Sequence, residues 1–381
     1  MKNNYYISGM LISLALLSSC SQVEDSVCSS CGDSQETVAQ PYSVSFQLGG
    51  SVASVSRAAS VTQTDAEKKL TSLYAVVFAD ADASGIADGT ANQADDNDLF
   101  VTAVPVDLTN YNNIAGATQP HLSFVVGEQG SYNICFVANP SGHTPDGVGL
   151  SGLASKISTL AAGVSKVSDF KSLVEDSAPS LDNSFLMTSP FYAVTTSYGK
   201  TATIAKAELT RAVARIDVLN KADGVTVQKL VFHNYGAKTS LISDGATFQS
   251  GNIISVKEYT PEGGLVGESE TGTSYAEKIY TYEQYAASGE DAVDEEASRP
   301  SLEVIYSIPS TGQWFTHTVK FEKSADGEGA PTVVPLKRNN HYLVTLTNQG
   351  GNINFTLGVK DWDQGETFEV AGSDFAENTQ I

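Results

Sequence analysis

Apolar and polar residues alternate along much of this chain in short runs. The first run, Ser43–Leu48, places Val44, Phe46 and Leu48 at every second position, and two glycines end it. A period of two predicts a strand with one buried face. We therefore expect a strand here, ahead of the main body of the chain.

Further runs follow in two series, separated by clusters of Gly, Asn, Asp and Pro. The first series comprises Leu73–Phe78, Leu99–Leu108, Leu122–Val126 and Tyr132–Ala138. The second comprises Ala202–Leu209, Val213–Leu219, Val227–Tyr235, Leu302–Ile308, Trp314–Phe321, Tyr342–Thr347 and Ile353–Val359. This spacing is typical of β-sandwiches and predicts a mostly β protein with two β domains. In the first series, Cys135 is expected in the core.

One segment instead has a helical period. Between Leu153 and Val174, apolar residues recur at steps of three and four, with Ser and Lys on the opposite side. This pattern predicts a helix that covers one face of a sheet. The expected fold is therefore mostly β with one or two short helices.

The N-terminus has the pattern of an export signal. An apolar run from Tyr5 to Ser19 follows the single basic residue Lys2, and small residues precede Cys20. The run is too short to span a membrane. It favours a lipoprotein signal, in which Cys20 carries the lipid, over an ordinary secretory signal with a chance cysteine. We expect a signal peptide over residues 1–19.

The segment from Ser21 to Gln40 is polar and typical of a tether. Within it, Cys28 and Cys31 have the spacing of a redox or zinc pair, but no second pair completes a metal site. Arg57 is the only basic residue between Lys2 and Lys68, and small residues such as Ala58 surround it. Such a segment is a candidate cleavage site for a trypsin-like protease, with an uncut linker as the alternative.

Composition excludes one class of partner. The 381 residues include 22 Lys and Arg against 44 Asp and Glu, a formal net charge of −22. This field opposes binding to nucleic acid phosphates or to anionic lipid. Charged residues make up only 17%, with 32 Gly, 16 Tyr and 15 Phe, which suits strands and turns.

No pattern predicts an enzyme or a cofactor. Gly199, Lys200 and Thr201 match the end of a phosphate-binding loop, but Val194 stands where that loop needs another glycine, so a hairpin turn is expected. The five histidines lack the short spacing of a helical metal site, and no Gly-x-Ser-x-Gly motif is present.

One acidic segment matches part of a calcium-binding loop. Asp80, Asp82 and Asp88 fall at ligand positions of such a loop, but Ala91 stands where a bidentate glutamate is required. A solvated acidic loop is the alternative, and we expect no metal.

Taken in order, several elements resemble one family. They are the lipobox at Cys20, the leading strand Val44–Leu48, Arg57 with Ala58, the strand Leu73–Phe78, and the segments Leu209–Val218 and Arg338–Thr345. Together they resemble the fimbrillins of Bacteroidales, and in particular FimA-like major stalk subunits of the type V pilus.

The resemblance implies two transthyretin-like β-sandwich domains, over residues 58–207 and 208–381, after the signal peptide and a propeptide over 20–57. It implies a precursor anchored by lipid in the outer membrane and cleavage after Arg57 by an Arg-specific protease. Cleavage would release the leading strand with Val44, Phe46 and Leu48. A strand from the C-terminal region of another copy would replace it in an extracellular fimbrium for adhesion, together with accessory anchor and tip subunits.

The tail beyond Trp362 contains candidate donor residues. Alternation resumes at Glu366 and continues towards Phe375, so Phe368, Val370 and Phe375 are the candidates. The alternative is a last edge strand of the chain's own domain.

Two other functions are alternatives to a stalk subunit. The first is an anchor or tip subunit of the same pilus system. A surface glycan-binding lipoprotein with aromatic platforms such as Trp314 is the alternative from another class, and the host or bacterial ligand is unknown.

Overall fold

The computed structural model describes the chain in segments. They are residues 42–50, 64–80, 91–92, 94–112, 121–145, 147–243, 253–267, 275–284, 299–323, 332–349, 351–362, 369–371 and 379–380. All of them belong to one compact unit, Gln40–Ile381. None of the helices in these segments is long and apolar enough to cross a membrane.

Nine strands form the first set. They are β1 Tyr42–Gly50, β2 Leu73–Ala79, β3 Ala91–Asn92, β4 Leu99–Pro105, β5 Leu122–Val126, β6 Gly130–Ala138, β7 Val174–Glu175, β8 Met187–Thr196 and β9 Thr201–Arg211. Most of them pair in the order β4-β2-β6-β8-β9-β1-β5, with β3 beside β8. β9 pairs with β8 only at its Arg211 end and with β1 along most of its length, so one core packs between β1, β5 and β9 and the β2–β6–β8 layer.

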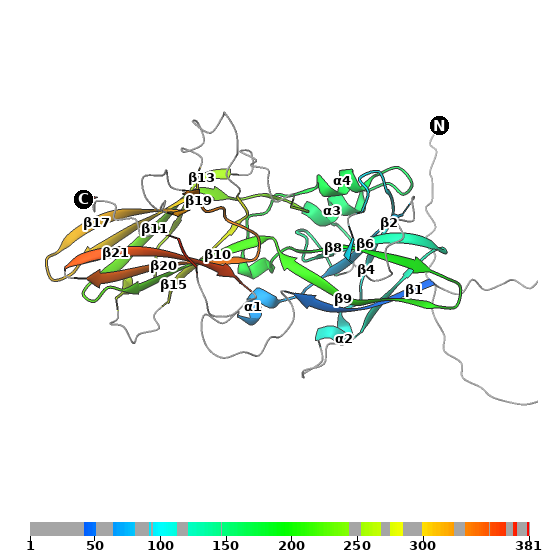
Figure 1. Cartoon of the computed structure of the whole chain (residues 1–381), viewed down its shortest axis with the longest axis horizontal. Helices are drawn as coiled ribbons and strands as arrows, with labels where there is room; N and C mark the ends of the chain where they lie inside the picture. Colours follow the sequence, from blue (N-terminus) through cyan, green and yellow to red (C-terminus); the bar gives the residue numbers. More distant parts are fainter. Residues whose placement is uncertain are drawn as a thin grey trace, which may run out of the picture. The chain divides into compact units, whose positions relative to one another are not determined.

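Strand β2 is buried on both faces, which explains its continuous apolar sequence. Ala75 and Val77 belong to the core shared with β1, whereas Val76 and Phe78 pack on the opposite side. There the helices α3 (Gly152–Ser158) and α4 (Val167–Lys171) cover the sheet, as Figure 1 shows.

The sequence pattern predicted one continuous helix between Leu153 and Val174, and this prediction was wrong. Two short helices replace it, with Gly163 at φ +70° between them and Val164 71% exposed. The described residues also include α1 (Asp65–Lys68), α2 (Thr109–Asn112) and a 3-10 turn, η1 (Leu181–Asn183), so the helices outnumber the one or two expected.

The remaining strands form the second set. They are β10 Val213–Lys221, β11 Thr226–Gly236, β12 Thr239–Ser240, β13 Ile253–Tyr259, β14 Leu265–Val266, β15 Tyr275–Tyr282, β16 Ser301–Ile308, β17 Gln313–Lys320, β18 Glu322–Lys323, β19 Thr332–Val333, β20 Asn340–Gln349, β21 Asn352–Asp361, β22 Glu369–Ala371 and β23 Thr379–Gln380. One sheet has the order β15-β10-β20-β21-β22, and another has the order β13-β11-β16-β17-β23, with β14 beside β11. The short strands β7 and β12 pair with each other and so join the two sets, while β18 pairs with β19.

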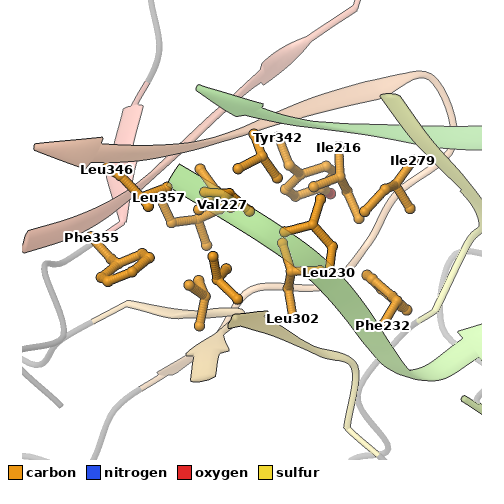
Figure 2. Close-up of a cluster of buried hydrophobic side chains, with 14 of the residues drawn as sticks. Ile216, Val227, Leu230, Phe232, Ile279, Leu302, Tyr342, Leu346, Phe355 and Leu357 are labelled. Carbon is orange, nitrogen blue, oxygen red and sulfur yellow. The ribbon is translucent and has the colours of Figure 1, made fainter. Parts of the chain in front are cut away.

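The two sheets of the second set enclose a separate apolar core. Ile216 and Tyr342 from one sheet meet Leu230 and Leu302 from the other, and all four side chains are fully buried. Figure 2 shows these side chains pointing into the space between the strands. The alternation that predicted the strands therefore also selects the residues of this core.

The structure confirms the expected mostly β fold. All eleven runs of the two predicted series coincide with strands, from β2 to β21. The proposed division between residues 207 and 208 stays a prediction, and β9 runs across that position to Arg211.

Candidate functional site

The predicted leading strand lies within β1, which is inserted between two strands. β1 runs antiparallel to β5 over five residue pairs and parallel to β9 over seven. Figure 1 labels β1 and β9 in this part of the molecule. Val44 and Phe46 are fully buried, and Leu48 is 3% exposed. The alternation seen in the sequence thus separates a core-facing set from a polar set.

Aromatic contacts anchor this strand. The ring of Phe46 lies 4.3 Å from that of Phe136 on β6 and 6.0 Å from that of Phe124 on β5, between centroids. On the other face, Ser43 Oγ lies 2.7 Å from Thr201 Oγ1. Burial of a Phe side chain contributes about 1.5–3 kcal/mol, so Phe46 is a principal contact of β1.

Strand β5 lies at the end of its sheet, next to β1. In the described part of the chain β5 ends the strand order, and β1 is its paired neighbour. Without β1, both β5 and β9 would carry unpaired backbone N–H and C=O groups along a shared gap. Such edges readily accept another strand.

After β1, the next described element along the chain is helix α1. Arg57 and Ala58 lie between β1 and this helix, outside the described residues. Helix α1 begins with a capping box: the backbone N of Thr64 donates to Glu67 Oε2 at 2.5 Å, and the backbone N of Glu67 donates to Thr64 Oγ1 at 3.4 Å. This cap fixes the orientation of the Glu67 side chain.

Glu67 enters a buried charge cluster, here defined as Glu67, Arg211, Arg215 and Asp217. Arg215 Nη1 donates to Glu67 Oε1 at 3.0 Å, and its Nε and Nη2 donate to the two oxygens of Asp217 at 2.8 and 2.6 Å. Arg211 Nε donates to the backbone oxygen of Glu67 at 2.9 Å. Two cations and two anions balance, as burial of charge requires.

Aromatic and polar groups surround the charge cluster. Tyr280 donates its hydroxyl to Glu67 Oε1 at 2.7 Å, and Arg211 lies 4.7 Å from the ring centroid of Trp362. Trp362 also packs against Phe185, so it joins the two strand sets and lies outside the core of Figure 2.

The pKa shifts follow from this environment. Burial tends to raise the pKa of Asp217, but hydrogen bonds from His341 and Arg215 outweigh it, and the pKa is lowered. Burial lowers the pKa of His341 against the opposing effect of Asp217, whose Oδ2 lies 3.1 Å from His341 Nε2. Burial, followed by the charge of Glu67, raises the pKa of Tyr280, which keeps this hydroxyl a donor.

Sequence reasoning did not select the charge cluster as a site. Its signal was present in Leu209–Val218, where charged residues alternate with apolar ones, a pattern that usually marks a solvated strand face. Here Ile216 and Val218 face the second core, and Arg215 and Asp217 are covered by Glu67 and Tyr280.

The described parts of the tail form two short pairings. Val370 lies in β22, where it is paired with Gly358 of β21, and β23 pairs with Phe315 and Thr316 of β17. Phe368 and Phe375 lie outside the described residues.

Of the other candidates, Cys20, Asp82 and Asp88 lie outside the described residues. Asp80 directly follows β2, and its backbone N donates to Ser131 O at 3.0 Å. Within the described segments, no group of His, Cys, Asp and Glu is placed to hold a metal ion. Cys135 is fully buried in β6, and burial raises its pKa to about 12.

Comparison with known proteins identifies the family. No curated protein matches the sequence. Among solved structures, a protein of Parabacteroides distasonis assigned to cell adhesion has a TM-score of 0.55 at 14% identity, covering 86% of this chain and 99% of that one. The tip fimbrial protein Mfa3 of Porphyromonas gingivalis, truncated at its C-terminus, has a TM-score of 0.52 at 16% identity, covering 84% and 100%. These matches show a shared fold. The family model for the major fimbrial subunit protein (FimA) matches residues 42–262, more than half of the chain, and the chain therefore belongs to this family of fimbrial subunits.

Proposed function

We propose that the chain is a stalk subunit of a surface fimbrium, with a structural rather than a catalytic role. It is exported as a lipoprotein through Cys20, cleaved after Arg57, and polymerised by donor-strand exchange into an extracellular filament for adhesion. The observation that carries this proposal is the position of β1, buried between β5 and β9 and followed by the segment that contains Arg57.

Cleavage at this position would separate two parts of the chain that have different anchors. Hydrolysis of the peptide bond between Arg57 and Ala58 leaves β1 attached by non-covalent contacts alone. Helix α1 lies on the other side of the cut and stays fixed through Glu67. The strand can therefore leave while helix α1 remains anchored.

The gap left by β1 would accept only strands with a suitable pattern of side chains. The surface that contacts Val44, Phe46 and Leu48 is apolar, and Phe124 and Phe136 are part of it. A replacement strand needs apolar residues at every second position. In the tail, Phe368 and Val370 have this spacing.

The two described strands of the tail have fewer paired residues than β1. Three residue pairs join β22 to β21 and two join β23 to β17, against twelve for β1 with its two neighbours. A segment with few pairings is released at lower cost, which favours the tail as the donor.

The alternatives predict different features. An anchor subunit would keep its lipid, and a tip subunit needs no donor tail, so the presence of both Arg57 and the tail favours the stalk. A glycan-binding lipoprotein would need an aromatic platform, and Trp314 is 46% exposed on β17. Among the described residues of β17, no other large aromatic side chain is equally exposed. A single exposed ring does not form a platform, which favours the pilin over a glycan-binding protein.

The proposal is tested with the full chain and an Arg-specific protease. Cleaved protein should form filaments in electron micrographs, and N-terminal sequencing of these filaments should start at Ala58. The variant Arg57→Gln should stay monomeric under the same treatment, and Lys68→Gln, which alters another basic residue of the same region, should polymerise normally. Wild-type protein that is cut after Arg57 and stays monomeric would overturn the proposal.

A further inference from the structure

A cavity of about 370 Å³ lies where the two strand sets meet. Its walls come from the residues just before β2, the turn after β6, Glu175 of β7, the segment between β7 and β8, and Tyr282 of β15. The volume is in the range of small-molecule sites. Among the described residues, β1, β5 and β9 contribute nothing to its lining, so the cavity is separate from the gap proposed for polymerisation.

The lining combines polar and apolar surface, and its described residues include no Lys or Arg. Glu175 carries the one carboxylate among the described lining residues. It is 2% exposed and held in place: Oε1 accepts from the backbone N of Ser177 at 2.9 Å, and Oε2 accepts from that of Ser141 at 3.0 Å. Carboxylate oxygens retain further capacity to accept hydrogen bonds. The site therefore suits a ligand with hydroxyl donors and opposes an anion.

Two buried hydroxyls at the cavity have no partner. Ser72 and Ser184 both line it, they are 4% and 7% exposed, and within the described structure neither Oγ atom has a hydrogen-bond partner. Buried polar side chains are nearly always satisfied by protein, water or ligand. Two unsatisfied hydroxyls at one cavity thus point to a ligand that both donates and accepts.

Ser184 also has a strained backbone. Its φ of 61° and ψ of 154° lie in a region that is essentially restricted to glycine. The next residue is fixed, because the ring of Phe185 lies 4.8 Å from that of Tyr280 and its carbonyl accepts from Asn139 Nδ2 at 2.9 Å. Strain that the surrounding packing maintains is concentrated at binding sites.

We propose that this cavity binds a neutral, hydroxyl-rich small molecule of the size of one monosaccharide unit. Sugar hydroxyls donate and accept, which matches Ser72 and Ser184, and they can donate to Glu175. The cavity is complete within one chain, so binding requires neither cleavage nor polymerisation and goes beyond the stalk role.

The test uses the uncleaved full chain and the methyl glycosides of glucose, galactose, mannose and N-acetylglucosamine, each up to about 20 mM, a range that detects millimolar affinity. At least one should bind in saturation-transfer NMR, and the anionic methyl glycoside of N-acetylneuraminic acid should not. Ala178→Trp, at an exposed wall of the cavity, should weaken binding at least about tenfold. Ala162→Trp, at an exposed position outside the cavity, should leave the affinity unchanged.

Two variants of Ser184 distinguish the effect of its hydroxyl on binding from the effect of its backbone strain on stability. Ser184→Ala and Ser184→Gly both remove the hydroxyl and should weaken binding by about threefold or more. Ser184→Gly also relieves the backbone strain, so its Tm should exceed that of Ser184→Ala. Absence of binding to all four neutral glycosides, binding that Ala178→Trp leaves intact, or equal binding of the anionic glycoside would each overturn the proposal.

Discussion

Oε1 of Glu67 lies 3.0 Å from Nη1 of Arg215, and neither side chain is more than 2% exposed. This contact joins the short helix α1 to β10, a strand paired on both sides in the second set. A buried ion pair contributes little net stability compared with apolar packing, but the loss of one partner leaves a buried charge without compensation. Glu67 is therefore a sensitive position.

Replacement of Glu67 by Ala should lower the free energy of unfolding by about 3–5 kcal/mol. Urea denaturation of the uncleaved chain measures the change. Asp65→Asn, on the exposed side of the same helix, is the control and should cost about 0.5 kcal/mol or less. Equal urea midpoints for wild type and Glu67→Ala would contradict the role assigned to this contact.

His341 should make the free energy of unfolding depend on pH below about pH 6.5. Burial lowers its pKa from 6.5, so the unfolded chain binds more protons than the folded chain below that value. Its contribution is complete above 6.5 and is lost as pH falls towards the folded pKa. His341→Gln should flatten the curve of unfolding free energy against pH. An unchanged slope in His341→Gln would be the opposing result.

Phe46→Asp should destabilise the precursor by about 3–5 kcal/mol, because it places an unpaired carboxylate against Phe124 and Phe136. Ser45→Asp is the matched control, since its paired neighbours Ser123 and Thr203 are exposed. Thermal unfolding should separate the two precursors. After cleavage and removal of β1 the difference should vanish, and its persistence would argue against release of the strand.

Deletion of residues 366–381 should leave a folded and cleavable protein that forms no filaments. Both cores lie upstream, and the described part of the tail makes five residue pairs, so the Tm should fall by only a few degrees. Electron microscopy after cleavage gives the decisive measurement. Normal filaments from the truncated chain would exclude the tail as donor.

Cys135 should be inert in the folded, cleaved chain. Cleavage after Arg57 removes the other three cysteines, so the thiol count refers to Cys135 alone. With a pKa of about 12, about one molecule in ten thousand carries the thiolate at pH 8, and the side chain is buried. A thiol reagent should detect no thiol before denaturation and one after it, and rapid reaction of the native protein would be evidence against this packing.

The sequence pattern predicted two kinds of strand: those with one buried face and those with both faces buried. Leu122–Val126 alternates because every second residue faces the core, and Leu73–Phe78 is continuous because helices cover its second face. Both are direct effects of backbone periodicity on burial.

Features that depend on distant parts of the chain were not predictable. The helical period between Leu153 and Val174 did not show that α3 ends at Ser158, ahead of a turn in which Gly163 has a positive φ, and Val164 fits the apolar stripe yet is exposed. The burial of Arg215 depends on Glu67, which is far away in the sequence. No local pattern carries that information.

The position of β1 also has a mechanical consequence. A strand bonded along both edges, by five pairs to β5 and seven to β9, resists a pull along its axis in shear, because pairs on both sides must break together. A strand at a sheet edge, pulled at one end, can instead open one pair at a time. A donor seated where β1 lies would therefore distribute tension over two neighbouring strands, so the strength of each junction under flow would be determined by the length of the gap.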